Sequence, residues 1–129
     1  MTVRIEEINS SIRRSRPEIM IDTVQINHLT QKIIEIANPE KIILFGSYAC
    51  GQPTEDSDLD VMVVLPFTGH WAYKAVEIRQ QLPLYDFSLD LLTRTSSQVS
   101  DRLAIGDPFI KSIMEQGRVL YESADARVD

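Results

Sequence analysis

Three aspartates in this sequence have the types and spacing that could carry out chemistry. Asp58 and Asp60 stand two residues apart at the start of an apolar run, and Asp90 lies within the apolar segment 87–92. Side chains alternate faces along a strand, so Asp58 and Asp60 are expected to point the same way. Two like charges repel in that position unless a cation offsets them, and oxygen-only ligands suit Mg²⁺ or Mn²⁺.

A metal site would form if the strand containing Asp90 lay beside the strand that begins at Asp58. Three carboxylates would then converge, and such a cluster can hold two metal ions roughly 3.5–4 Å apart for in-line displacement at phosphorus. An acid inside an apolar strand is itself a candidate functional group. The sequence therefore predicts Asp58, Asp60 and Asp90 as metal ligands and catalytic residues.

Gly46 and Ser47 are predicted to bind phosphate. They follow the apolar run 42–45, where a strand would pass into a helical turn. Backbone N–H groups at the start of a helix bind anions. Gly46 allows the backbone to approach a phosphate closely, and the Ser47 hydroxyl adds a donor. Together with the aspartates, this pair predicts a nucleoside triphosphate held by its phosphates against metal ions.

Each feature has a structural alternative when it is taken alone. Acids in loops and Gly-Ser turns are common, and Asp90 could be a salt-bridged or edge-strand acid. Asp86 is an alternative third acid, although it lies nearer the start of its strand. The combination is more specific than its parts, because each residue stands on the element that the chemistry requires.

Other site motifs do not fit the sequence. Asp56, Asp58 and Asp60 resemble the start of an EF-hand loop, but Val61 and Phe67 replace the required Gly and Glu. The sequence contains no P-loop and no Gly-x-Gly-x-x-Gly motif.

The two histidines and the cysteine give no alternative site. His28 and His70 have no ligand-spaced Cys or His partner, which argues against zinc. Neither histidine is placed to activate Ser47 in a catalytic triad. Cys50 is interpreted as a small packed residue rather than a nucleophile.

Hydrophobic periodicity and capping residues predict the elements that position these groups. Asp22 is expected to cap the first helix of the core, Asn38-Pro39 to end it, and Asp107 to cap the last helix. Gly117 is expected as its C′ residue. The predicted helices are 26–36, 71–82, 96–103 (capped by Ser96 or Ser97) and 108–116, and the predicted strands are 42–45, 61–65, 87–92 and 118–121. This order predicts an α/β fold, a small mixed β-sheet packed with helices.

Composition predicts one soluble domain. The chain has 129 residues, of which 43% are hydrophobic and 25% charged, and its net charge of −6 argues against general nucleic-acid binding. The single cysteine suggests a reducing compartment, and the absence of a signal sequence or long apolar run predicts a cytoplasmic protein without a membrane segment. We expect an N-terminal helical extension over 1–21, a catalytic domain over 22–122 and a frayed tail over 123–129.

These motifs resemble the nucleotidyltransferase superfamily of DNA polymerase β. Its signature is Gly-Ser, a spacer, Asp-x-Asp and a later third Asp, which Gly46-Ser47, Asp58-Leu59-Asp60 and Asp90 match. The chain's small size and the segment 115–122 resemble the minimal members of that superfamily. The resemblance covers roughly residues 22–122.

The resemblance implies a palm-like catalytic core that moves a nucleoside monophosphate, most simply AMP from ATP, onto a hydroxyl. It implies that Asp58 and Asp60 bind two Mg²⁺ ions, with Mn²⁺ as a substitute. Asp90 would bind one ion and help activate the acceptor, while Gly46 and Ser47 would hold the outer phosphates. Minimal members often pair with a helical HEPN-type toxin, and some are antitoxins that transfer AMP to a toxin tyrosine.

One residue departs from the superfamily pattern. Many members have Arg where this chain has Cys50, so a cation that could contact phosphate is missing. Lys74 and Arg79, on the helix after the second strand, are candidate replacements. The alternatives to protein adenylylation are an inactive module that neutralises its partner by contact, and transfer to a small molecule. A homo- or hetero-oligomer is also consistent with the sequence.

Overall fold

A four-stranded mixed sheet forms the centre of the fold. The computed structural model describes residues 20–124. The strand order is β3-β2-β1-β4, with bounds Lys41–Phe45 for β1, Leu59–Val64 for β2, Leu89–Arg94 for β3 and Arg118–Glu122 for β4. Strand β1 is antiparallel to β2 and β4, whereas β2 and β3 are parallel. The prediction of a small mixed α/β sheet is confirmed.

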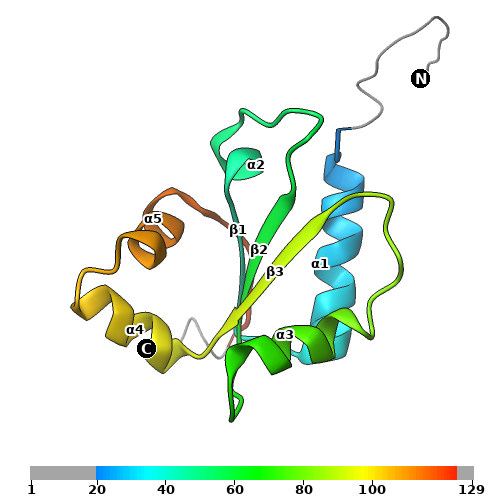
Figure 1. The fold of residues 1–129 in the computed structure, drawn as a ribbon. Helices are drawn as coiled ribbons and strands as arrows, with labels where there is room; N and C mark the ends of the chain where they lie inside the picture. Colours follow the sequence, from blue (N-terminus) through cyan, green and yellow to red (C-terminus); the bar gives the residue numbers. More distant parts are fainter. Residues whose placement is uncertain (1–19, 125–129) are drawn as a thin grey trace, which may run out of the picture.

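Helices cover both faces of the sheet (Figure 1). Helices α1 and α3 lie over one face, and α4 and α5 lie over the other. The short α2 follows β1 directly at one end of the sheet. The helix bounds are Thr23–Ala37 for α1, Ser47–Cys50 for α2, Trp71–Arg79 for α3, Ser96–Ala104 for α4 and Pro108–Gln116 for α5.

Alternation along the strands divides the core into two clusters. On β2, Val61 and Val63 are buried against the face covered by α1 and α3. Met62 and Val64 are buried against the face covered by α4 and α5. Asp60 has the same parity as Met62, so the strand directs it to the α4/α5 face. That face therefore carries the predicted chemistry.

Caps fix the helix boundaries. As predicted, Asp22 caps α1 and Asn38 ends it. The structure adds that Asp22 forms a reciprocal capping box with Gln25 and that Asn38 adopts the left-handed conformation. Asp107 caps α5 by accepting two backbone N–H groups, also as predicted. The predicted caps Ser96 and Ser97 are wrong. Thr95 caps α4, because its hydroxyl accepts the amide of the third helical residue while the Gln98 side chain accepts its own.

Gly117 differs from the prediction in its conformation. It ends α5, but its φ of −72° is ordinary extended backbone rather than the left-handed C′ geometry. Glycine is needed there because a Cβ atom would collide with the carbonyl oxygen of Ile113 and would crowd the Ile43 side chain and the Leu44 backbone. The turn from α5 into β4 therefore depends on close approach to β1.

Two expectations lie outside this description. Most of the N-terminal extension predicted over 1–21, and residues 125–129 of the tail predicted over 123–129, fall outside the described residues, so the boundaries of both stay predictions. Between residues 20 and 124, no helix combines the length and apolarity that crossing a membrane requires.

Replacing Gly117 with alanine tests the close approach. We expect Gly117→Ala to lower the free energy of unfolding by about 2–3 kcal/mol, since backbone atoms cannot yield to the added methyl group. Gly106→Ala is the control, because Gly106 has a φ of +78° and open space around it. The control should cost only about 1–2 kcal/mol of conformational strain. Urea unfolding followed by circular dichroism measures both, and a larger loss for Gly106→Ala would contradict the packing explanation.

Candidate active site

Asp60 and Asp90 lie side by side on the open part of the α4/α5 face. They are direct partners in the parallel pairing of β2 with β3, so their side chains leave the sheet on the same face. On the other side of β2, Asp60 is the partner of Phe45, the last residue of β1. The register of two strand pairs thus places both carboxylates at the end of the sheet where α2 begins.

The Asp60 carboxyl titrates abnormally. Partial burial is the largest cause raising its pKa from 3.8 to about 6, and the negative charges of Asp90 and then Asp58 raise it further. A hydrogen bond to Asp90 favours the protonated form as well. Asp60 is thus a partly buried carboxyl group close to other negative charges, and a cation bound beside it would offset their repulsion.

Asp58 lies near this pair without completing a three-ligand cluster. It precedes the first residue of β2 and is exposed, so the sheet ladder does not hold its side chain. Its charge still raises the pKa of Asp60. Within residues 20–124, however, no three His, Cys, Asp or Glu side chains are arranged to hold a metal ion together. The structure thus brings two of the three predicted carboxylates together and leaves the third beside them.

Gly46 brings the backbone directly against the Asp60 carboxylate. It has a φ of +76°, and a Cβ atom would collide with Oδ2 of Asp60. Only glycine meets both conditions, since L side chains rarely adopt that φ. The close approach was expected for Gly46, but the sequence did not show that Asp60 is the group it approaches.

Helix α2 begins immediately after Gly46. Its Ser47 and Tyr48 amides stand in the first turn, where no preceding carbonyl of the helix can accept them. The Gly46 carbonyl accepts the Ala49 and Cys50 amides. The Tyr48 hydroxyl accepts the Ile21 amide at 3.1 Å, which ties α2 to the segment before α1. Gly46 and Ser47 therefore lie at the same sheet end as the aspartates, as the sequence predicted.

A cavity of about 340 Å³ joins these groups. Asp60 and Asp90 line it from the sheet, Gly46 and Cys50 line it from the region of α2, and α5 provides the opposite wall. The cavity falls within the size range of small-molecule sites. Its carboxylate oxygens are the ligand type that Mg²⁺ and Mn²⁺ prefer, so the donor set fits a divalent cation.

The α5 wall was not predicted as part of the site. Phe109, Ser112 and Gln116 line the cavity along one side of the helix. Their spacing of three and four residues is the helical signal that could have grouped them. Periodicity identified the apolar face containing Phe109, but it could not show which strand ends that face would meet.

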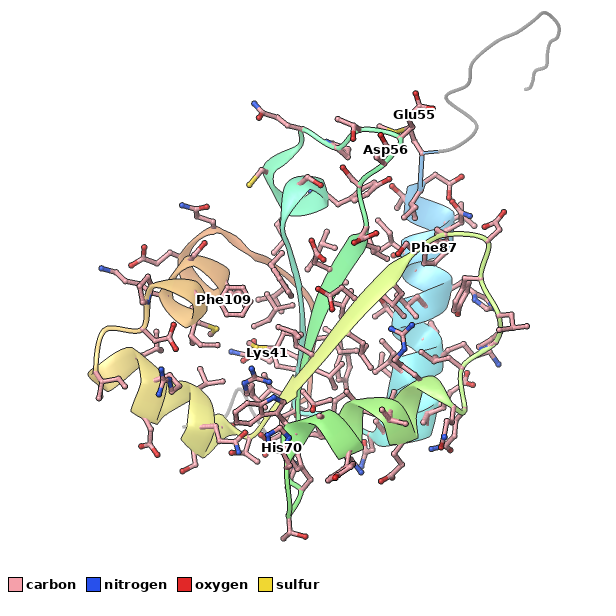
Figure 2. All side chains as sticks on the ribbon, viewed as in Figure 1. Lys41, Glu55, Asp56, His70, Phe87 and Phe109 are labelled. Carbon is pink, nitrogen blue, oxygen red and sulfur yellow. The ribbon has the colours of Figure 1, made fainter. Side chains whose placement is uncertain are left out.

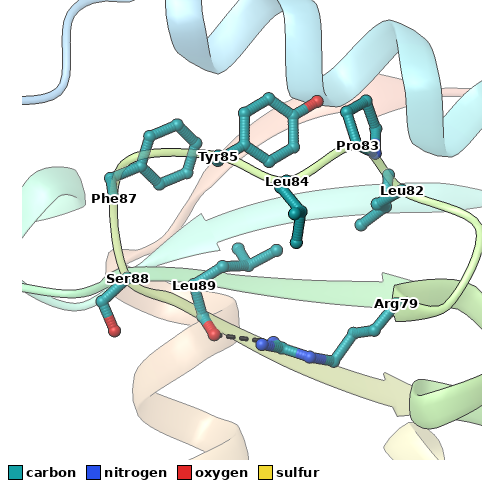
Figure 3. A pocket seen from close by; sticks show the side chains of 8 residues that line it. All are labelled: Arg79, Leu82, Pro83, Leu84, Tyr85, Phe87, Ser88 and Leu89. Carbon is teal, nitrogen blue, oxygen red and sulfur yellow. Dashed lines mark hydrogen bonds between the residues drawn. The ribbon is translucent and has the colours of Figure 1, made fainter.

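Cys50 lines the cavity as an exposed free cysteine. Lys74 and Arg79, the candidate replacements for the arginine that is missing at position 50, do not line this cavity. Lys74 pairs with Glu77 at 3.1 Å. Arg79 donates to the carbonyl oxygen of Leu89 at 2.7 Å in a separate cavity of about 220 Å³ (Figure 3). That second cavity contains no aspartate and lies away from α2, so these expectations are wrong.

Comparisons with known proteins bear on the activity of this site. The family described as "Polymerase beta, Nucleotidyltransferase" matches residues 25–126, well over half of the chain. Two Methanocaldococcus jannaschii proteins, both named "putative protein adenylyltransferase", are 32% identical to it. One aligns over 83 residues, 64% of this chain and 78% of its own length. The other aligns over 79 residues, 60% of this chain and 71% of its own length.

Two solved structures share the fold. A "putative nucleotidyltransferase" from Sulfolobus solfataricus has a TM-score of 0.53 at 13% identity, covering 75% of this chain and 77% of its own. A mutant of the toxin–antitoxin MntA–HpeT also has a TM-score of 0.53, at 22% identity, covering 77% of this chain and 75% of its own. At these identities the likeness concerns the arrangement of helices and strands.

Removing the Asp60 charge should stabilise the metal-free protein. The native pKa of about 6 lies above the ordinary 3.8, so ionised Asp60 costs stability at pH 7.5, and the cost fades as the pH falls from 6 towards 4. We expect Asp60→Asn to raise Tm by roughly 2–4 °C at pH 7.5 in EDTA, with little difference at pH 4, close to the ordinary pKa of the carboxyl group. Differential scanning calorimetry at the two pH values measures both shifts.

Asp56→Asn is the matched control for this experiment. It removes the same charge from an exposed loop position outside the carboxylate pair. Its Tm should differ from wild type by no more than about 1 °C at either pH. Equal shifts for the two variants would show that net charge, rather than the position of Asp60, is responsible.

Proposed function

Since this chain belongs to the polymerase β nucleotidyltransferase family, we propose that it transfers AMP from ATP to a hydroxyl group of a partner protein. The observation that carries the proposal is the in-register pair of Asp60 and Asp90 with Gly46 packed against it. Two neighbouring carboxylates, whose repulsion a cation would offset, thus lie beside the Gly46 backbone, which can approach a phosphate closely. The two relatives named as protein adenylyltransferases support AMP as the group and protein as the acceptor.

The aspartates would orient the reacting phosphate. Asp60 and Asp90, joined by Asp58 after rotation of its exposed side chain, would hold Mg²⁺ ions. Bound Mg²⁺ would polarise the α-phosphate and stabilise charge on the attacking and leaving oxygens. The acceptor oxygen would bond to the α-phosphorus as the bond to the bridging oxygen of pyrophosphate breaks. Asp90, on the edge strand β3, would accept the proton that the acceptor hydroxyl loses.

Gly46 and Ser47 would position the leaving pyrophosphate. Gly46 lines the same cavity as the carboxylates, and Ser47 follows it as the first residue of α2, so its hydroxyl would reach the phosphates from the rim of the cavity. Cys50 contributes no charge there, so the β- and γ-phosphates depend on neutral donors and on the metal. We therefore expect nucleotide binding to require the divalent cation.

The partner we propose is a HEPN-type helical toxin, with this chain as its antitoxin. The support is the resemblance to minimal members of the superfamily and the fold shared with a protein of a toxin–antitoxin pair. We place this pair in the cytoplasm.

Mg²⁺-dependent ATP binding tests the site without knowledge of the acceptor. We expect calorimetric titration of the wild type with ATP to show binding with Mg²⁺ and none with EDTA. Asp60→Asn and Asp58→Asn should each weaken Mg–ATP binding at least about 10-fold. Asp56→Asn should bind like wild type, and unchanged binding by the Asp60 variant would remove Asp60 from the site.

Transfer itself is tested with α-labelled ATP and a HEPN-type protein from the same organism. Label should appear on the HEPN-type protein with Mg²⁺, and Asp90→Asn should lower the rate roughly 100-fold or more while the two proteins still copurify. Transfer at the wild-type rate by this variant would contradict the role of Asp90. If the label appeared only on a small molecule, the acceptor would be that small molecule and not a protein.

Nucleotide binding should weaken in acid. Protonation of Asp60 below its pKa of about 6 removes a negative charge from the proposed metal site. Mg–ATP affinity should therefore fall as the pH drops from 7.5 to 5, by roughly 10-fold for one unit below the pKa. Titrations in matched buffers measure this dependence, and constant affinity across the range would contradict ionised Asp60 as a ligand.

A further inference from the structure

A second cavity lies next to the carboxylate cavity on the α4/α5 face. Its volume is about 330 Å³, and Phe109 lines both cavities, so they are neighbours. Trp71 and Arg94 line its far end, and Gln98 and Arg102 line it from α4. The transfer reaction proposed above uses none of these residues.

Arg94 is a partly buried cation without a carboxylate partner among the described residues. Its guanidinium donates to the neighbouring Thr93 carbonyl at 2.7 Å, and no ion pair to it is formed within residues 20–124. Burial lowers its pKa, while the charge of Asp107 partly offsets that effect. The guanidinium plane is thus partly desolvated at a cavity wall.

The Arg94 wall is rigidly supported. The guanidinium carbon lies 4.1 Å from the centre of the Trp71 ring, which in turn contacts the tilted His70 ring at 4.4 Å between centroids. The buried Thr93 hydroxyl donates to the Trp71 carbonyl at 2.7 Å and so fixes the start of α3 to β3. One face of the guanidinium is therefore backed by an aromatic ring.

Phe109 provides an aromatic surface between the two cavities. It projects from α5 towards the strands (Figure 2) and is 50% exposed. An edge-to-face contact with Phe45, at 5.9 Å between centroids, holds it beside the end of β1. Its amide donates to the Asp107 cap at 2.9 Å, which fixes the first turn of α5.

We propose that this second cavity binds the nucleobase of the nucleotide, stacked against the Arg94 guanidinium and the Phe109 ring. The proposal rests on the proposed nucleotidyltransferase function, because the phosphates must lie at Asp60 and Asp90. Flat guanidinium and aromatic surfaces are the groups on which bases stack in proteins. They are less suited to an aliphatic or purely anionic ligand.

The separation of the two cavities fits a nucleotide. Asp90 and Arg94 both lie on β3, four residues apart on the same face, which corresponds to about 13 Å between their Cα atoms. The side chains of Asp90 and Arg94 span part of this distance, so a ribose and base could span the remainder. The half-buried Leu92 lies between them on the same face and packs against the α4/α5 core, while Ile110 gives the second cavity an apolar wall.

Polar groups in the cavity can contact the edge of a base. The Gln98 side-chain oxygen accepts the Thr95 amide, and the Gln98 NH₂ group has no partner within residues 20–124. Arg102 uses its Nε on Asp107 at 2.8 Å, which leaves its terminal nitrogens to donate. Donors of this kind complement the ring nitrogens and carbonyl oxygens of nucleobases.

The experiment compares Mg–ATP with Mg–tripolyphosphate, which has the phosphates but no base. Calorimetry gives both dissociation constants for the full chain at pH 7.5. Trp71, the single tryptophan, reports on the second cavity by fluorescence. We expect Mg–ATP to change the Trp71 emission and to bind more tightly, and Mg–tripolyphosphate to bind without changing the emission.

Two variants test the stacking surfaces. Arg94→Met and Phe109→Leu should each weaken Mg–ATP binding roughly 10-fold and leave Mg–tripolyphosphate binding within about 2-fold of wild type. Arg118→Met is the matched control, since Arg118 is an exposed residue of β4, the edge strand opposite β3. This variant should change neither dissociation constant. Circular dichroism spectra confirm that the compared variants are folded.

The outcomes separate this inference from the proposed function. If wild type binds neither ligand with Mg²⁺, both the proposed function and this inference fail. If wild type binds both and the two variants weaken them equally or not at all, only the base-binding assignment fails. Unchanged ATP binding with a raised KM for the protein acceptor would assign the cavity to the acceptor and overturn the inference.

Discussion

Repulsion between neighbouring carboxylates is the constraint on which this site depends. The parallel pairing of β2 with β3 sets Asp60 directly beside Asp90, and the sheet cannot separate them without losing its register. Partial burial, followed by the charges of Asp90 and Asp58, raises the pKa of Asp60 to about 6, so folding places this charge where it is unfavourable. Under the proposed function, a bound cation would offset this unfavourable charge.

The rest of the fold serves to fix that pair and to leave it accessible. Helices α1 and α3 bury one face of the sheet, which makes the strands rigid. On the other face, α4 and α5 pack over Met62 and Val64 and stop short of the carboxylates. Gly46 lets β1 turn into α2 against Asp60 without displacing it. Rigidity on one face and incomplete cover on the other together produce a preorganised cavity.

Much of this arrangement could be predicted from local sequence signals. Alternation, caps and breakers located the helices and strands within a few residues, because those signals act over short distances. The Gly46-Ser47 and Asp-x-Asp motifs were predicted to lie together, and the structure has them at the same end of the sheet. The conformation of Gly117 was not predictable, because it depends on the approach of β1 from over 70 residues away. The position of Asp58 was also not predictable, since a residue just outside a strand escapes the alternation rule.

The two ends of the α4/α5 face carry opposite charges. The chain carries a net charge of −6, and the three site aspartates concentrate negative charge where a polyanionic nucleotide would place its phosphates. Among the described residues, no Lys or Arg lines the carboxylate cavity, so under the proposed function the charge balance would come from divalent ions that bind with the nucleotide. The cations that this face does carry, Arg94 and Arg102, lie at the other end of β3 and around α4. A nucleotide oriented with its phosphates at the carboxylates and its base near the arginines would satisfy both ends, whereas the reverse orientation would leave metal-demanding carboxylates facing a neutral base.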